Sequence, residues 1–464
     1  MFLFAVFLAI IYGLYCYMNN MLDTKRLIVI LFILGFAIKL AYVLYTTVHQ
    51  RQHDVEAFES TANGHAAYIL YIFENWSVPA FDVREHWQFY HPPLHHFLEA
   101  VWLKLQIFFG IEKKAAYEGL QYLTLFYSSL SMYLSYRIMQ EIKLRRTGLV
   151  IAFAIVAFHP TFIIFAGGLN NDILSISFML GAVLNTLVWY KNRTFRNILK
   201  IALCIGLGMF TKLSVWMVAP AVAAVFLSAL INNKGKLKNL IGQMAAFIGV
   251  CAPIGLFWSI KNYLAYKVPF TYVPRLSETN RLYVGNHSVA ERLFDFNFSQ
   301  LESVYNQIVF FAGKYYEYNP TIGLFKTAMF DESINDTYYP KISFCGVLLF
   351  WSSVILGLLG FVAMIYMFIK KNSMNPTFKV FFGILFAVIL GSYYIFCFQF
   401  PFSCTQNIRY AAPLIIVGAM FIGLWITKTF GKKTKAAKAF RIVAYALTIC
   451  FCISSVMTYT LIGI

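Results

Sequence analysis

The sequence predicts an all-α polytopic membrane protein, and three observations carry that prediction. The 464 residues are 60% hydrophobic and only 12% charged, whereas a soluble domain of this size carries about 25% charged residues. Apolar runs of roughly 20 residues, long enough to cross a hydrocarbon core of about 30 Å, recur from end to end. Basic residues gather in alternate loops between these runs, which is typical of the cytoplasmic loops of membrane proteins.

Twelve apolar runs are predicted to span the membrane. The first, residues 2–17, has neither a basic segment before it nor a small-residue cleavage site, so we expect a retained span and not a signal peptide. The spans are expected near residues 2–18, 27–47, 117–138, 149–167, 171–190, 196–211, 214–231, 239–260, 344–369, 377–398, 408–427 and 439–461.

The apolar stretch 94–110 is predicted to lie along the membrane interface and not to cross it. It contains two histidines, a glutamate and a lysine. Treating it as a span would also place the basic stretch EIKLRR (141–146) on the same side as the first large loop, against the usual distribution of basic residues. A helix at the interface avoids both problems.

With these spans, the basic charge falls on one side of the membrane. The loops on that side hold 22 basic residues against Asp23 and Glu141, whereas the other side holds 15 basic and 18 acidic residues. This pattern predicts a multi-pass protein of the cell membrane with its basic loops in the cytoplasm, facing anionic lipids. The net charge of +18 is therefore a signal of topology, and we expect no nucleic-acid partner.

The spans divide the chain into three predicted parts. An N-terminal transmembrane module covers residues 1–261 and includes a large outer loop at 48–116. A second outer segment covers residues 262–343, which are polar, aromatic and rich in turn residues, and C-terminal transmembrane helices follow at 344–464. A connection as long as the second segment is unusual for a loop without function. The eight cysteines include no CxxC pair and fall mostly in apolar runs, so we interpret them as small core residues.

The stretch RQHDVEAF (51–58) places His53, Asp54 and Glu56 just beyond the second predicted span. A lone aspartate in a loop is usually a solvated carboxylate, and that is the alternative interpretation of Asp54. Its position at the mouth of a span, in a chain with so few charges, nevertheless makes it a candidate functional residue.

The stretch QFYHPPLHHFLEA (88–100) ends the first outer loop. Two successive prolines fix an extended entry to the next helix, so His91, His95 and His96 are expected at the membrane surface. His95, His96 and Glu99 could chelate a divalent metal from one helical face, since residues four apart are neighbours. The spacing is not HExxH, and interfacial hydrogen bonding is the alternative, so a metal cofactor stays open.

Polar residues also gather at FAGGLNNDILSISF (165–178), a predicted tight turn between two spans. The Gly-Gly pair permits a close backbone turn, and Asn171 and Asp172 then open the next span. Asp172 as a helix N-cap is the alternative interpretation. Because polar groups at membrane depth are costly unless they line a cavity, both residues are candidate cavity residues.

Two basic residues are expected at the same level. GMFTKLSVW (208–216) lies between two closely spaced cytoplasmic loops, so the break around Lys212 must reach the outer interface. CTQNIRYAAPL (404–414) puts Arg409 at the outer start of a span, where an arginine can hold a phosphate with two parallel hydrogen bonds. Snorkelling of the side chain to the interface is the alternative for each. With the two aspartates, these residues predict a membrane-embedded cavity that opens away from the cytoplasm.

As a set, these motifs resemble the GT-C glycosyltransferases, in particular the family 39 enzymes that include protein O-mannosyltransferases and aminoarabinose lipid A transferases. The resemblance rests on an acid shortly after an early span, the YHPPL entry to a juxtamembrane helix, the Asn/Asp-rich turn and the G-x-x-TK break. It covers most of the first 220 residues and recurs at NIRYAAPL. It implies a bundle of about 12 transmembrane helices, with juxtamembrane helices in the first outer loop.

The resemblance also implies a function. Such enzymes take a sugar from a polyprenyl-phosphate donor and transfer it on the extracytoplasmic side, as in glycosylation of the cell envelope. Asp54 matches the acid that acts as catalytic base, Asp172 matches a second acid near the donor, and Lys212 and Arg409 match positions near the lipid phosphate. Asn171 is expected beside the donor, and His53, Glu56, His91 and His95 are expected around the acceptor or in the cavity wall.

Two departures leave the acceptor open between glycan, lipid and protein. The segment 262–343 shows no β-trefoil pattern, and the sequence has HDVE where the protein mannosyltransferases have an Asp-Glu pair. A single inverting displacement needs one base that takes the acceptor proton as the bond forms, and Asp54 could serve. The alternatives are a polysaccharide polymerase or ligase using a polyprenyl diphosphate glycan, and a lipid-linked sugar transporter or flippase.

Overall fold

The computed structural model describes residues 2–59, 62–296, 317–332, 339–371 and 374–463, and every structural statement below concerns these residues. Helices are the main regular elements of the described chain, and its only β-type pairing is an isolated bridge between Tyr283 and Phe402. Parts of the second predicted outer segment, residues 297–316 and 333–338, lie outside the described residues.

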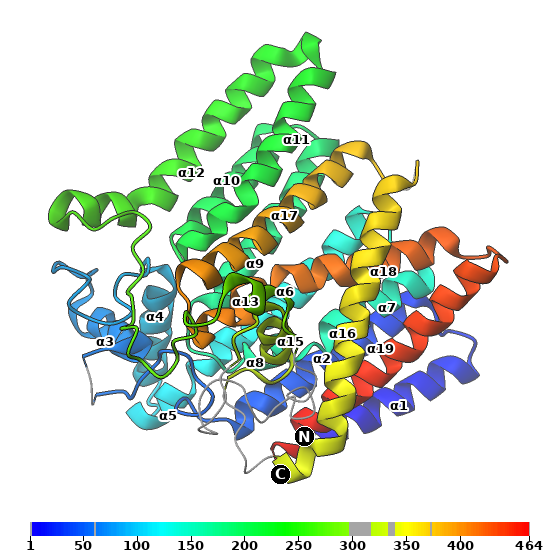
Figure 1. Ribbon diagram of the computed structural model, residues 1–464, viewed down its shortest axis with the longest axis horizontal. Helices are drawn as coiled ribbons and strands as arrows, with labels where there is room; N and C mark the ends of the chain where they lie inside the picture. The colour runs from blue at the N-terminus through cyan, green and yellow to red at the C-terminus, as the bar shows by residue number, and fades with distance from the viewer. Residues whose placement is uncertain (1, 60–61, 297–316, 333–338, 372–373, 464) are drawn as a thin grey trace.

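The helices pack as a diagonal bundle, with a smaller group of helices beside its lower left end (Figure 1). The first half of the chain forms α1 (Phe2–Met18), α2 (Thr24–Tyr45), α3 (Gly64–Asn75), α4 (Leu94–Phe108), α5 (Lys113–Glu118), α6 (Gln121–Glu141), α7 (Arg146–Ala157), α8 (Pro160–Ile164), α9 (Asp172–Lys191), α10 (Phe195–Met209), η1 (Leu213–Val218), α11 (Ala219–Asn232), η2 (Lys234–Lys236) and α12 (Leu237–Tyr266). The second half forms α13 (Val289–Phe294), α15 (Pro320–Phe330), α16 (Tyr339–Ile369), α17 (Pro376–Gln399), η3 (Ser403–Gln406), η4 (Ile408–Tyr410), α18 (Pro413–Thr429) and α19 (Lys435–Leu461).

Local sequence explains where several of these helices begin. The Asp23 side chain accepts a hydrogen bond from Arg26 N at 2.8 Å and caps α2. Asn375 caps α17 by accepting from Thr377 N at 2.9 Å, with Pro376 in the first turn. Side-chain caps of this kind satisfy amides that have no partner inside the helix, and proline is tolerated there because it lacks that amide.

The prediction of an all-α polytopic membrane protein is confirmed. Seven helical segments are long and apolar enough to cross a membrane, and α1, α7 and α18 are shorter apolar helices. A helix stands at each of the twelve predicted spans, but α6 and α10 fall in neither group. In α6 the reason is composition, because it buries serines such as Ser128, Ser131 and Ser135 inside the bundle. The Ser131 hydroxyl lies 2.8 Å from that of Ser177 on α9, so this polar helix is held by interhelical hydrogen bonds.

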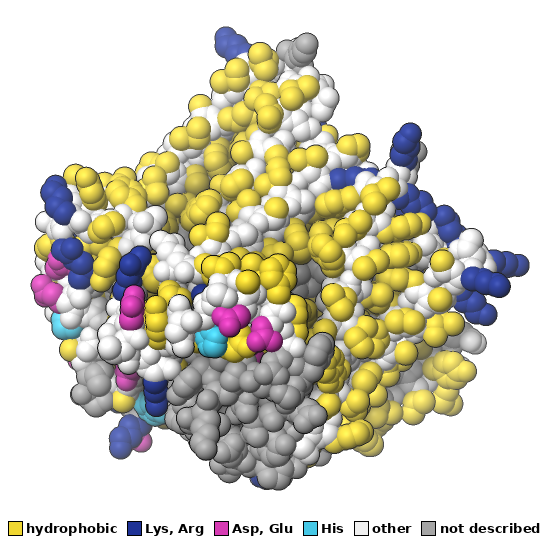
Figure 2. Space-filling model, in the orientation of Figure 1, with side chains coloured by type: hydrophobic (Ala, Val, Ile, Leu, Met, Phe, Trp, Pro, Cys, Tyr) yellow, Lys and Arg dark blue, Asp and Glu magenta, His cyan; other side chains and the backbone are white. Residues whose placement is uncertain are grey.

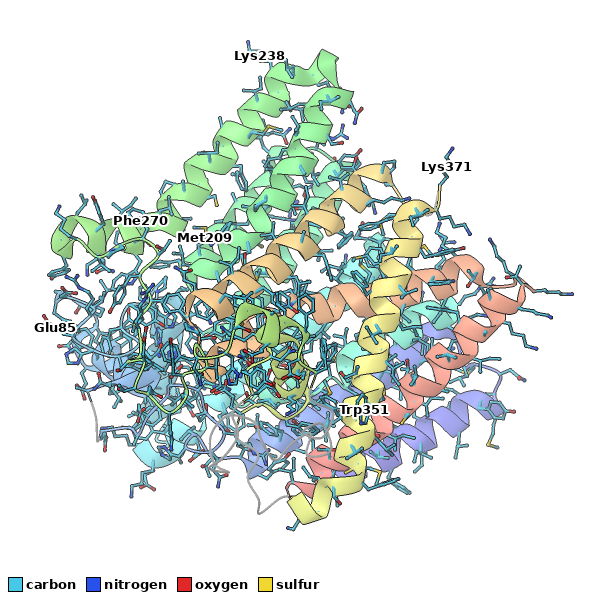
Figure 3. All side chains as sticks on the ribbon, in the orientation of Figure 1. Glu85, Met209, Lys238, Phe270, Trp351 and Lys371 are labelled. Atoms are coloured by element: carbon cyan, nitrogen blue, oxygen red, sulfur yellow. The ribbon has the colours of Figure 1, made fainter. Side chains whose placement is uncertain are left out.

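Acidic side chains are unevenly distributed over the molecule. Basic side chains line its top and right edges, whereas acidic and histidine side chains appear at the left and centre, together with further basic side chains (Figure 2). Lys238 and Lys371 mark the first region, and Glu85 marks the second (Figure 3). This distribution agrees with the predicted orientation, in which the basic ends face the cytoplasm.

The first outer loop folds into a compact lobe with its own core. α3 and α4 pack against each other (Figure 1), over a cluster that includes Val55, Tyr68, Phe89 and Tyr117. α4 corresponds to the stretch predicted to lie at the interface, and it is not among the candidate spans of the described chain. Its residues His95, His96 and Glu99 are fully buried inside this lobe. His96 is covered by His65 and Tyr68 of α3, whereas His95 faces the Leu169 carbonyl. The position of these histidines relative to the membrane surface stays a prediction.

We predict that α4 does not cross the membrane, so residues on either side of it lie on the same side. In a chain whose accessible native cysteines are replaced, Arg84→Cys and Lys113→Cys should both react with an impermeant thiol reagent added from outside. Both wild-type side chains are exposed, at 42% and 47%. Protection of position 113 alone would show that α4 spans the membrane.

α7 and α18 touch through glycine, and this contact holds a C-terminal helix on the N-terminal module. A Cβ atom on Gly148 would overlap the carbonyl oxygen of Gly423, and a Cβ on Gly423 would overlap that of Gly148. The helices can approach so closely only because neither residue has a side chain.

Gly148→Ala is therefore expected to destabilise the protein by about 1–3 kcal/mol, the usual effect of overpacking. Gly391→Ala is the matched control, since an added Cβ on that α17 residue meets no described atom within 4 Å. Thermal unfolding in detergent should show a lower Tm for the first variant alone. Equal Tm values would mean that the helices do not pack as described.

Candidate active site

One large cavity lies where the loop 48–116 meets the adjacent ends of the bundle helices. Its volume is about 1010 Å³. Seven of the nine predicted site residues line it, namely His53, Asp54, His91, Asn171, Asp172, Lys212 and Arg409. Glu56 and His95 do not line it: Glu56 is exposed to solvent, and His95 is buried within the outer lobe. The structure thus brings together residues that are up to 356 positions apart.

The loop that carries Asp54 is fixed by backbone contacts on both sides. The Asp54 carbonyl accepts a hydrogen bond from His65 N at 2.9 Å, at the start of α3. Gly64 has a φ of +88°, and a Cβ there would lie 2.5 Å from the Val55 carbonyl oxygen, so the turn requires glycine. Asp54 itself has a φ of +56°, a left-handed conformation that is uncommon outside glycine and is found at functional sites.

Gln52 joins this loop to the turn before α9. Its side chain donates to the Gly167 carbonyl at 2.8 Å and accepts from Leu169 N at 2.9 Å. The two loops that carry Asp54 and Asp172 are therefore tied to each other. A Cβ on Gly167 would lie 2.9 Å from the Tyr42 ring, so the second loop packs closely on α2.

Asp54 forms an ion pair with Arg409. Its Oδ2 lies 3.4 Å from Arg409 Nη1, and Trp87 Nε1 donates to Oδ1 at 3.5 Å. The Asp54 side chain is 33% exposed, whereas that of Arg409 is 11% exposed. Burial raises the pKa of Asp54, but Arg409, His65 and His53 together outweigh burial and hold that pKa below its usual value. Asp54 is therefore an ionised carboxylate at the cavity wall.

Asp172 and Lys212 form a second ion pair. Lys212 Nζ contacts Asp172 Oδ1, and both side chains are largely buried. The Asn171 amide donates to the Thr211 carbonyl at 3.0 Å, which holds the break between α10 and η1 against the start of α9. Asp172 is the first residue of α9 and Asn171 occupies the N-cap position, so Asp172 is not the cap. The cation of each pair also lies near the Tyr410 ring, Lys212 Nζ at 5.4 Å and Arg409 Cζ at 5.0 Å.

The burial of Arg409 disfavours the snorkelling interpretation. A snorkelling side chain reaches water, whereas Arg409 points to an acid inside the cavity wall. Its backbone N–H donates to the Asn407 side chain at 2.9 Å, which fixes the start of the short helix η4. Arg409 Nε has no hydrogen-bond partner among the described residues, so the guanidinium keeps one donor that the protein does not use.

A buried group of His53, Asp331 and Glu332 lies next to these pairs. His53 Nε2 lies 2.7 and 2.8 Å from the two carboxylate oxygens of Asp331, and His53 Nδ1 lies 3.7 Å from Glu332 Oε2. The Asn407 amide donates to Asp331 at 3.0 Å and to Glu332 at 2.7 Å. Burial lowers the pKa of His53, but the two facing carboxylates raise it further, to about 9.

The sequence did not identify Asp331, Glu332 or Asn407 as site residues. All three lie in stretches that the sequence marks as polar, FDESINDTYYP and CTQNIRYAAPL, but neither stretch has a spacing that points to His53. His65 was also missed. Its Nδ1 lies 2.8 Å from His96 Nε2, and its ring stacks on His91, so it links the cavity wall to the lobe behind.

The suggested metal group on α4 is not assembled in the described part of the chain. His95 Nε2 faces the Leu169 carbonyl at 3.4 Å, and both Glu99 carboxylate oxygens are buried without a described hydrogen-bond partner. Among the described residues, ligand atoms of His53, Asp331 and Glu332 lie within 4.8 Å of one another, but the two ring nitrogens of His53 face different carboxylates.

Residues 90–258 match the protein family described as dolichyl-phosphate-mannose-protein mannosyltransferase. No curated protein matches the chain. The chain is similar to a solved structure of the archaeal oligosaccharyltransferase AglB from Archaeoglobus fulgidus, in complex with an inhibitory peptide and a dolichol-phosphate. The TM-score is 0.52 and the sequence identity is 12%, and the match covers 95% of this chain and 56% of that chain. Apo ArnT from Cupriavidus metallidurans has a TM-score of 0.50 and 12% identity, covering 91% of this chain and 74% of that chain.

The fold is therefore a GT-C-like polytopic helical fold, and the predicted resemblance to family 39 glycosyltransferases is confirmed, with the family match covering residues 90–258. The chain spans little more than half the length of the oligosaccharyltransferase that it resembles. The family match begins at the entry to α4 and ends within α12, so it includes Asp172 and Lys212 but neither Asp54 nor Arg409. The roles of these residues stay predictions.

Proposed function

We propose that this chain transfers a sugar from a polyprenyl-phosphate donor to an acceptor hydroxyl at the extracytoplasmic face of the membrane. The observation that carries the proposal is the placing of two acid–cation pairs, Asp54–Arg409 and Asp172–Lys212, on the wall of one cavity. An acid can take the acceptor proton, and a cation can stabilise the charge on the leaving phosphate. The acid and the cation that the reaction needs therefore lie in one site.

The cavity also has a wall suited to a lipid. Beside the ion pairs it is lined by apolar side chains of α9, η1 and α17, including Met179, Trp216 and Ile395. Trp216 and Ile395 are 46% and 66% exposed, although they lie on helices predicted to span the membrane. We infer that the polyprenyl chain lies along this wall, with its phosphate at Lys212 and Arg409. A structurally similar oligosaccharyltransferase was solved in complex with a dolichol-phosphate, which supports a polyprenyl phosphate as the ligand.

In the proposed reaction, Asp54 acts as general base. The acceptor oxygen attacks the anomeric carbon as its proton passes to the Asp54 carboxylate, and the bond from that carbon to the phosphate oxygen breaks. The electron pair leaves with the polyprenyl phosphate, whose charge Lys212 and Arg409 stabilise. One displacement inverts the anomeric configuration, so no second nucleophile is required.

The purified chain should be tested for transfer from a polyprenyl monophosphate monosaccharide, with the anomeric configuration of the product determined by NMR. The proposal predicts transfer with inversion. A chain that uses only a long glycan on polyprenyl diphosphate would be a polymerase or ligase instead. Product with retained configuration would rule out the single displacement.

A further inference from the structure

His65 is a buried residue of the cavity wall to which the proposed reaction gives no role. It is 2% exposed and lies in the first turn of α3, where its backbone N–H donates to the Asp54 carbonyl. Asp54, Asp172 and Lys212 all act electrostatically on its imidazole ring, so the ring lies near both acid–cation pairs. The donor sugar must also lie near both pairs, because its anomeric carbon reacts between the base and the phosphate.

The His65 ring is held by a hydrogen bond to His96. His65 Nδ1 lies 2.8 Å from His96 Nε2, and the two ring planes differ by only 10°. His96 is fully buried and stacks on Tyr68, with ring centroids 4.0 Å apart. Burial lowers the pKa of His65 to about 3, although Asp54 raises it, and burial holds the pKa of His96 well below its usual range. Both rings are therefore neutral, with one N–H donor and one acceptor each.

The surroundings of His96 decide which of the two rings donates. His96 Nδ1 is buried and has no hydrogen-bond partner among the described residues. A proton there would be a buried donor without an acceptor, which is rarer in proteins than a buried acceptor without a donor. The His96 proton is therefore assigned to Nε2, which donates to His65 Nδ1. His65 then carries its own proton on Nε2, a nitrogen that the described residues neither bond nor enclose.

We propose that His65 Nε2–H donates a hydrogen bond to a hydroxyl or ring oxygen of the donor sugar, and that His96 positions His65 for this contact. The inference rests on the proposed function and adds to it the residue that holds the sugar. A neutral N–H suits a neutral sugar oxygen, whereas the charged phosphate is held better by the cations Lys212 and Arg409. A sugar fixed at a hydroxyl and at its phosphate is oriented for attack at the anomeric carbon.

The first test needs no substrate. In the purified chain labelled with nitrogen-15 at histidine, the NMR signals of His65 can be assigned by their loss in His65→Asn. We expect the tautomer with a proton on Nε2 and none on Nδ1, unchanged between pH 7 and pH 5 because the ring stays neutral. The opposite tautomer, or a charged imidazolium, would overturn the proposal. Either result would leave the proposed transfer reaction standing.

The second test compares two lipids, the polyprenyl-phosphate monosaccharide that supports transfer and the same polyprenyl phosphate without its sugar. Asparagine at position 65 keeps a polar group near the place of Nδ1 but has no donor at the place of Nε2, whereas a glutamine amide can reach that place. His65→Asn should raise the Kd of the sugar-bearing lipid about 3- to 10-fold, the effect of losing one neutral hydrogen bond, and leave the Kd of the sugar-free lipid unchanged. His65→Gln should restore most of the lost affinity.

His86→Asn is the matched control, since His86 belongs to the same loop but does not line the cavity. It should leave both Kd values unchanged. Equal weakening of both lipids by His65→Asn would mean that His65 only supports the fold of the site, and unchanged binding of both would mean that it does not contact the sugar. Either outcome would overturn the proposal. A wild-type chain that transfers no sugar from such a lipid would contradict the proposed function, and this inference with it.

Discussion

Asp54→Asn is expected to lower the rate of sugar transfer at least ~100-fold, the effect of losing a general base. Asparagine has the size of aspartate, and its carbonyl oxygen can still accept the hydrogen bond from Trp87. The amide cannot take a proton from the acceptor hydroxyl. The measurement is the initial rate at saturating donor, together with the Tm of the variant in detergent.

Glu85→Gln is the matched control for this experiment. Glu85 is an exposed acid in the same outer loop, at the left edge of the molecule (Figure 3), and its loss should leave the rate unchanged. If well-folded Asp54→Asn protein kept a turnover close to that of the wild type, Asp54 would not be the base.

Arg409→Lys is expected to weaken binding of the polyprenyl-phosphate donor although the charge is kept. An arginine can give a phosphate two parallel hydrogen bonds, and a lysine ammonium cannot reproduce that geometry. Loss of one charge-assisted hydrogen bond costs roughly 1.5–3 kcal/mol, which is about 10- to 150-fold in donor affinity. The donor Kd and the Tm should be measured for Arg409→Lys and for Arg409→Ala.

Arg275→Lys is the control for the change of side chain alone. Arg275 is exposed and does not itself line the cavity, although it lies over the ring of Phe400, which does, so its replacement should not alter the donor Kd. A structural role for Arg409 predicts a different outcome, in which the lysine variant binds donor normally and the alanine variant only lowers Tm. That outcome would remove Arg409 from the donor site.

The sequence predicts the bundle and much of the cavity wall because each signal is local. A span ends where apolar residues end, and Asp54, Asp172, Lys212 and Arg409 each stand at such an end. Residues at the same depth in the membrane come together once the helices pack. The positions of these four side chains therefore follow from the spans, although their pairing with one another does not.

Side-chain direction in an irregular loop does not follow from sequence. Asp54 lines the cavity while Glu56 is exposed, and both have left-handed backbone conformations with φ of +56° and +59°. Loop residues lack the periodic pattern of a helix or strand, from which the directions of their side chains could be predicted. His95 is absent from the cavity lining for a related reason, since its side chain faces the Leu169 carbonyl, a contact between distant parts of the chain.

The link between His53 and Asp331 was beyond sequence reasoning because it joins residues 278 positions apart. It depends on how the end of α15 reaches the first outer loop, which is set by packing across the whole bundle. Two adjacent acids in a polar stretch are usually solvated. Nothing in the sequence therefore marks Asp331 and Glu332 as site residues. Their burial, and the Asn407 amide between them, are visible only in the fold.

The most direct test of the account is a structure of the full chain with a polyprenyl phosphate bound. The account predicts the phosphate in the cavity, within hydrogen-bond distance of Lys212 and Arg409, with the lipid chain along Met179, Trp216 and Ile395. Asp54 should then lie on the side from which an acceptor approaches. A phosphate bound away from both cations, or a lipid bound on another face of the bundle, would contradict the account.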